Sequence, residues 1–280
     1  MVSVKVAALA GFTALFATAA HAADMPQLLP PVELPAVEEF GGWYLRGDIG
    51  MTNQGFKSLF HPKYNDPGTL SVSPSGMGWD SSMFFGLGVG YKFNDWFRAD
   101  LTGEYRGKAN FHGSDIVRTT SGPGVDNYSG SKSEWVVMGN AYVDLGTWYG
   151  FTPYVGAGVG AARITISGFR DDSVFLTPGL GVGTYMAQDA SKWNFAWALH
   201  AGITYKVTQA MSIDLGYRYI DLGSATTGSG VSFDGTNANG RPFTFNHIYS
   251  HDLKLGVRWM LDAPVYERRS IDLPPLMRKG

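Results

Sequence analysis

Charged side chains recur at alternate positions in several segments of this chain of 280 residues. They are Arg46, Asp48, Arg98, Asp100, Glu104, Asp214, Arg218, Asp252, Lys254 and Arg258, with Lys92, Arg106, Asp144 and Lys206. Because successive side chains of a β-strand point to opposite faces, this spacing puts the charges on one face. Facing charges of this kind can form a conduction path, a proton relay or an ion-paired plug. Their nearly balanced signs favour the plug, since a buried charge is tolerated when it is paired.

Large apolar residues occupy the positions between these charges. The pattern predicts eight strands, at 43–52, 83–93, 97–106, 135–145, 151–162, 193–207, 211–220 and 249–259. Each is close to the roughly 9–11 residues that a tilted membrane strand needs. Two barrels fit this alternation: a lipocalin-like barrel with apolar residues inside, and a membrane barrel with apolar residues outside.

Aromatic residues at both ends of the apolar face decide between the two barrels. Trp43, Phe93 and Trp259 lie at one end of the strands, and Trp135 and Trp193 lie at the other. Aromatic side chains with a polar tip suit the bilayer interface, so two aromatic belts indicate two interfaces. The sequence therefore predicts an all-β protein, an eight-stranded antiparallel up-and-down transmembrane β-barrel.

The connections between the predicted strands alternate in length. Residues 94–96, 146–150 and 208–210 are tight turns, whereas 53–82, 107–134, 163–192 and 221–248 are expected to be long polar loops. Short turns on one rim and long loops on the other are typical of outer-membrane barrels. With an even number of strands, both ends of the barrel are then on the periplasmic side.

The two ends of the chain are expected to lie outside the barrel. Residues 1–22 resemble a signal peptide, with cleavage between Ala22 and Ala23. A Pro-rich periplasmic linker at 23–40, the barrel at 41–260 and a periplasmic tail at 261–280 follow. In an extended polyproline conformation, the linker reaches roughly 50 Å.

Several kinds of chemistry are disfavoured. The chain has no cysteine and a net charge of -2, so thiolate metal sites, disulfides and nucleic-acid binding are not expected. The repeat at 156–160 lies inside a strand without a following helix, and therefore is not a dinucleotide fingerprint. We considered Ser250 and Ser212 with His251, His247 or His200 for catalysis, but adjacent Ser250 and His251 point to opposite faces. No catalytic residue, metal or cofactor is expected.

Three segments carry a resemblance to a known family. Residues 43–48, 153–160 and 215–219 resemble the OmpA-like eight-stranded β-barrels, in particular the small outer-membrane β-barrel family of alphaproteobacteria. Lys254, Gly256 and Trp259 are similar to the assembly signal of such barrels, although that signal usually ends the chain. In the family, a mature Ala-Asp start such as Ala23-Asp24 can be joined to peptidoglycan.

The resemblance implies a structural or surface protein of the cell outer membrane that supports envelope integrity and surface interactions. Expected partners are outer-membrane lipid and lipopolysaccharide, the barrel-assembly machinery and peptidoglycan. Two alternatives remain open: a small-solute porin, and a barrel enzyme acting on lipid or peptide.

Overall fold

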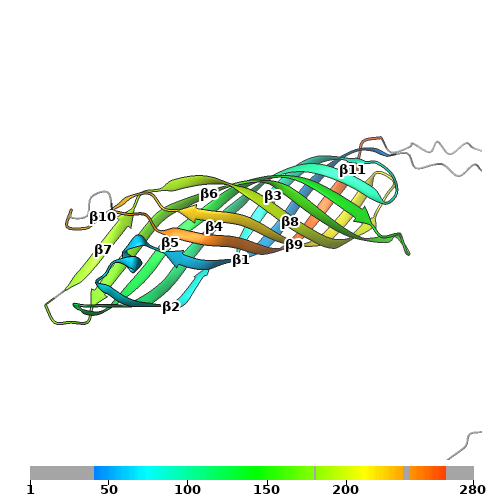
Figure 1. Cartoon of the computed structure of the whole chain (residues 1–280). Helices are drawn as coiled ribbons and strands as arrows, with labels where there is room; N and C mark the ends of the chain where they lie inside the picture. The colour runs from blue at the N-terminus through cyan, green and yellow to red at the C-terminus, as the bar shows by residue number, and fades with distance from the viewer. Residues whose placement is uncertain (1–40, 180, 236–239, 263–280) are drawn as a thin grey trace, which may run out of the picture. The chain divides into compact units, whose positions relative to one another are not determined.

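The computed structural model describes residues 41–179, 181–235 and 240–262 (Figure 1). The elements are β1 (Gly42–Phe60), the short 3-10 helix η1 (Pro62–Asn65), β2 (Thr69–Trp79), β3 (Ser82–Lys92), β4 (Phe97–Thr119), β5 (Gly122–Asp144), β6 (Phe151–Phe175), β7 (Val182–Ala187), β8 (Ala190–Lys206), β9 (Met211–Thr226), β10 (Gly230–Ser232) and β11 (Thr244–Met260). The predicted signal peptide, Pro-rich linker and periplasmic tail lie outside the described residues, apart from the first two residues of the tail.

The sheet closes on itself. β1 pairs with β3 on one side and with β11 on the other. Antiparallel pairing continues from β3 through β4, β5, β6, β8 and β9 to β11. Closure pairs the backbone N–H and C=O groups of every strand, which hydrocarbon surroundings require. Each predicted strand segment overlaps one strand of this ring, and the all-β antiparallel barrel is confirmed.

The outer surface of the ring is apolar. Leu87 is 75% exposed, and Phe195 and Leu253 are similarly exposed, whereas Arg98 and Asp252 are buried inside. The lipocalin-like alternative is therefore wrong, because it requires the opposite assignment of faces. No helix among the described residues is long and apolar enough to cross a membrane.

The prediction of four long loops is wrong for much of these segments, because they form strands. β4 and β5 have 23 residues each and β6 has 25, so these strands extend well beyond their predicted loop-side ends (Figure 1). Ser114 pairs with Asn127 deep inside the segment expected to be a loop. Backbone pairing needs no apolar face, and strands already aligned in the membrane can therefore continue as a hairpin outside it. The tight turns are confirmed: the Phe93 N–H, for example, donates to the Phe97 carbonyl across 94–96.

Short strands add to the sheet at the loop-side end of the barrel. β2 pairs with β4, β7 pairs with β6, and β10 pairs with β7. Inside this end lies a cluster of buried apolar side chains that includes Trp79, Phe111, Ile164, Phe169 and Phe245. The face that is apolar has therefore changed: in the membrane part it points outward, and beyond the membrane it points inward.

Candidate functional site

In the membrane part of the barrel, glycines on neighbouring strands leave space for the long inward-facing side chains. A Cβ atom at Gly90 would collide with the Tyr44 ring, and one at Gly158 would collide with the Asn140 side chain. Glycine at these strand positions lets long polar side chains cross a narrow barrel. Gly158 belongs to the repeat at 156–160, so the glycines of this repeat make room for inward-facing side chains of the neighbouring strand.

Arg46 is the centre of the ion-paired group nearer the tight turns. Its guanidinium donates to both carboxylate oxygens of Asp48, at 2.9 and 2.8 Å, and to Asp100 at 2.7 Å. Beside it, Arg98 donates to Asp144 at 3.1 Å and lies over the Tyr142 ring. These side chains are all buried. The same level of the barrel also holds the Arg258–Asp214 pair, at 3.3 Å.

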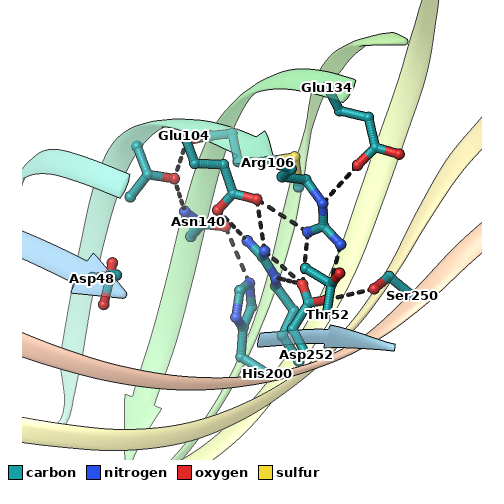
Figure 2. A network of polar contacts seen from close by, with 12 residues as sticks. Asp48, Thr52, Glu104, Arg106, Glu134, Asn140, His200, Ser250 and Asp252 are labelled. Atoms are coloured by element: carbon teal, nitrogen blue, oxygen red, sulfur yellow. Dashed lines mark hydrogen bonds and ion pairs between the residues drawn. The ribbon is translucent and has the colours of Figure 1, made fainter. Parts of the chain in front are cut away.

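A second group, shown in Figure 2, lies nearer the outer end and is built around Arg106. Arg106 binds Asp252 in a bidentate arrangement, at 2.8 and 2.9 Å, and its Nε lies 2.7 Å from Glu134. Arg218 joins Glu104 to Asp252, with its shortest contacts at 2.7 and 2.6 Å. Ser250 adds a hydrogen bond to Asp252. The three acids come from β4, β5 and β11, so the group links distant parts of the barrel.

The charges balance within each group. The first has four cations, Arg46, Arg98, Arg258 and Lys254, and four anions, Asp48, Asp100, Asp144 and Asp214. The second has three cations, Arg106, Arg218 and Lys132, and three anions, Glu104, Glu134 and Asp252. Of the fourteen charged residues that the sequence assigns to the inward face, all but Lys92 and Lys206 are buried in the interior, and eleven of these twelve form ion pairs. Lys254 makes no ion pair with any of the described residues.

Four charged residues lie elsewhere than the sequence pattern predicts. Lys206 is exposed, and Lys92 lies at the turn-side rim beside Asp95, so neither belongs to the interior groups. Lys132 and Glu134 are fully buried and paired to each other. Both lie in the segment 107–134, which the sequence predicts to be a loop. Extending the two-residue alternation backward from Trp135 would have placed them inward.

The apolar cluster covers the outer side of the ion-paired groups. Its aromatic side chains are in close contact: the ring centroids of Trp79 and Phe245 and those of Phe111 and Phe245 are both 4.9 Å apart. Lys132, the outermost charge of the second group, lies 5.0 Å from the Trp79 ring. Beyond the cluster, a cavity of about 570 Å³ lies among η1 and the outer ends of β4, β5, β6 and β7. Tyr128 and Phe243 belong to the cluster and also line the cavity, so they form its floor.

The residues considered for catalysis do not form a catalytic pair. Ser250 is buried and donates to Asp252, whereas His251 is exposed on the outer face and contacts the Tyr217 hydroxyl at 2.6 Å. His200 is buried and hydrogen-bonded to Asn140 at 3.1 Å.

In the assembly motif, Lys254 and Gly256 face inward and Trp259 faces outward. Of the described residues, no three His, Asp or Glu side chains form a group that could hold a metal ion.

The family of this chain is shown by a family profile and by a relative of similar length. The sequence profile of the family described as "Outer membrane protein beta-barrel domain" matches residues 8–260. An uncharacterised protein of Brucella suis is 31% identical over 274 residues, covering 86% of this chain and 93% of that protein. A protein of Rickettsia rickettsii, whose name describes it as a candidate adhesin, is 28% identical and covers 78% of this chain and 87% of its own length. The structure of Neisserial surface protein A aligns with a TM-score of 0.46 at 17% identity, covering 79% of this chain and 99% of that one.

Proposed function

Because this chain belongs to the outer membrane β-barrel family and is located in the cell outer membrane, we propose that it is a closed, non-conducting barrel. It acts at the cell surface, through the residues at its outer end. One observation carries this proposal. Two charge-balanced groups and an apolar cluster fill the interior, and the cavity lies on the outer side of that cluster. The name of the Rickettsia relative is in keeping with a role in surface interactions.

A filled interior disfavours the small-solute porin. An ion crossing the barrel would have to separate bidentate pairs such as Arg106–Asp252 and then pass between packed aromatic rings such as Trp79 and Phe111. Breaking a buried ion pair costs about 3–5 kcal/mol, and an ion in the apolar cluster would have no polar partner. A continuous water-filled path is therefore not expected.

Planar-bilayer recording tests the closed barrel. We expect no discrete conductance steps from the purified protein, under conditions in which a general porin gives clear steps. Lys254→Met serves to identify any current that does appear, because Lys254 faces the interior and makes no ion pair with the described residues. Steps whose ion selectivity changes in Lys254→Met would arise from the barrel interior, and the porin alternative would replace our proposal.

The amino terminus extends the proposal to the cell envelope. The expected mature start, Ala23-Asp24, lies outside the described residues and is followed by a Pro-rich linker. The α-amine freed by signal cleavage and a linker with a reach of roughly 50 Å suit transpeptidation. In this step the amine attacks a peptide bond of a peptidoglycan stem, a new amide forms, and the amino acid beyond the broken bond is released. A barrel attached in this way would connect the outer membrane to the cell wall and thereby support envelope integrity.

Mass spectrometry of sacculi digested with muramidase tests the attachment. We expect peptides that begin at Ala23 and carry a muropeptide on the α-amine. Peptides from the barrel, such as those containing Trp135, provide the control and should carry no such addition. If every Ala23 amine in the sample is free, the attachment to peptidoglycan is excluded, while the closed barrel is unaffected.

A further inference from the structure

The outer cavity contains carboxylates that are placed against one another by the strand register. Asp115 of β4 is directly opposite Asp126 of β5, and Asp171 of β6 is opposite Tyr128, two residues along β5 from Asp126. Asp126 and Asp171 line the cavity, and Asp115 is fully buried behind the lining residues Tyr64 and Tyr128. Like charges directly opposite each other in a sheet are destabilising. The barrel therefore holds an arrangement that is unfavourable without a counter-charge.

The described residues supply no counter-charge in direct contact. No ion pair joins any of these three carboxylates to a described Lys, Arg or His. The nearby Arg241 pairs with Asp66, at 3.7 Å, and Lys63 lies exposed at the rim. One oxygen of Asp115 accepts hydrogen bonds from Tyr64 and Tyr128, at 2.9 and 3.0 Å, but its buried Oδ1 has no partner among the described residues.

The electrostatic effect is large at Asp171. Burial, followed by repulsion from Asp126 and Asp115, raises the pKa of the Asp171 carboxyl to about 8. Burial also raises the pKa of Asp126 and of Asp115. The other titratable groups around the cavity are Lys63 of η1, His61 and Asp66 at the two ends of η1, Arg241, and the tyrosines Tyr64, Tyr128 and Tyr185. A bound cation would relieve the repulsion and displace the proton from Asp171.

Aromatic side chains make up much of the remaining wall. Phe243 is stacked on His61, with ring centroids 4.3 Å apart, and lies 5.7 Å from Tyr128 and 6.0 Å from Tyr185. The faces of such rings attract cations, and their area accommodates an apolar body. The volume of about 570 Å³ is in the range of small-molecule sites.

We propose that this cavity binds an organic ammonium ion, a primary amine attached to an aliphatic or aromatic body. The ammonium group occupies the position next to Asp126 and Asp171, and the body lies against Phe243 and Tyr128. A metal ion is disfavoured, since no three suitable side chains of the described residues are grouped to coordinate one. The inference rests on the proposed function, because a closed floor is what makes the cavity a binding site and not the mouth of a channel.

The test uses 2-phenylethylamine and its uncharged counterpart 2-phenylethanol, titrated by calorimetry into the full barrel in lipid nanodiscs. We expect the amine to bind at least about tenfold more tightly than the alcohol, which corresponds to one charge-assisted hydrogen bond. Binding of the amine should strengthen from about pH 6 to about pH 9, as Asp171 becomes ionised. Asp171→Asn should remove most of the preference for the amine.

Asp172→Asn is the matched control. Asp172 is the next residue of β6, has the same side chain and pairs with Arg170, and it does not line the cavity, so its loss should leave amine binding unchanged. The altered electrophoretic mobility of unheated barrels verifies that both variants fold. Equal binding of amine and alcohol, or equal losses in the two variants, would overturn the inference. If the amine site is overturned in this way but no conductance is seen in planar bilayers, the closed barrel is still supported. Conductance through the barrel interior would overturn the proposed function, whatever the result of the amine titration.

Discussion

Replacing Arg106 by methionine is expected to lower the free energy of unfolding by about 3–5 kcal/mol, because the change removes the direct ion pairs of Arg106 and leaves the buried group with one more anion than cations. Arg106 is fully buried and contacts Asp252, Glu134 and Glu104 at 2.8, 2.7 and 3.2 Å. Without it, three carboxylates share the two remaining cations of the group. Urea titration of barrels folded in liposomes measures the effect.

Two further variants separate lost pairing from lost volume. Lys254→Met also replaces a buried inward cation by methionine and leaves the first group with three cations for four anions. No direct ion pair with a described residue is lost, because each acid of that group keeps its arginine contact, so we expect a smaller change, below about 1 kcal/mol. Adding Asp252→Asn to Arg106→Met restores the charge balance, leaving Arg218–Glu104 and Lys132–Glu134, and should recover part of the lost stability. Equal unfolding midpoints for Arg106→Met and the parent would show that the ion-paired group does not stabilise the barrel.

Replacing Val159 by arginine is expected to destabilise the folded barrel by about 2–4 kcal/mol, the cost of a charge facing lipid near the middle of the bilayer. Val159 is on the outer face of β6 and is 58% exposed. Val174 is on the outside of the same strand, 15 residues further on and beyond the membrane part. Val174→Arg should therefore change the stability by less than about 0.5 kcal/mol.

The same liposome titration decides between these outcomes. The two variants introduce the same side chain at the same residue type, so any difference reports the surroundings of each position. The membrane boundary is inferred from the point at which the apolar face of the strands turns from outward to inward. Equal effects of Val159→Arg and Val174→Arg on stability would mean that this inferred boundary is wrong.

The membrane part could be predicted from the sequence because one physical rule governs it. Lipid outside and a narrow interior require apolar and polar residues to alternate, and Leu253, Lys254 and Leu255 already show that alternation. The same rule placed Arg46, Asp100 and Arg218 inside. It also located the tight turns, since they interrupt the alternation.

The part beyond the membrane could not be predicted in this way, because water lies outside it and the alternation reverses. Arg163 points outward while Ile164 and Ile166 point inward, with no break in β6 to mark the change. Polar residues such as Ser114 and Asn127 are typical of a loop in the sequence, although these two residues are paired between β4 and β5.

Ion-pair partners and the outer cavity likewise depend on register. The residues that meet at Arg106 come from β4, β5 and β11, and Arg106 and Asp252 are 146 residues apart in the sequence. The sequence determined which residues face inward, since a strand has a period of two. Only the tertiary structure decided which of them meet, because that depends on how far each strand is shifted against its neighbours.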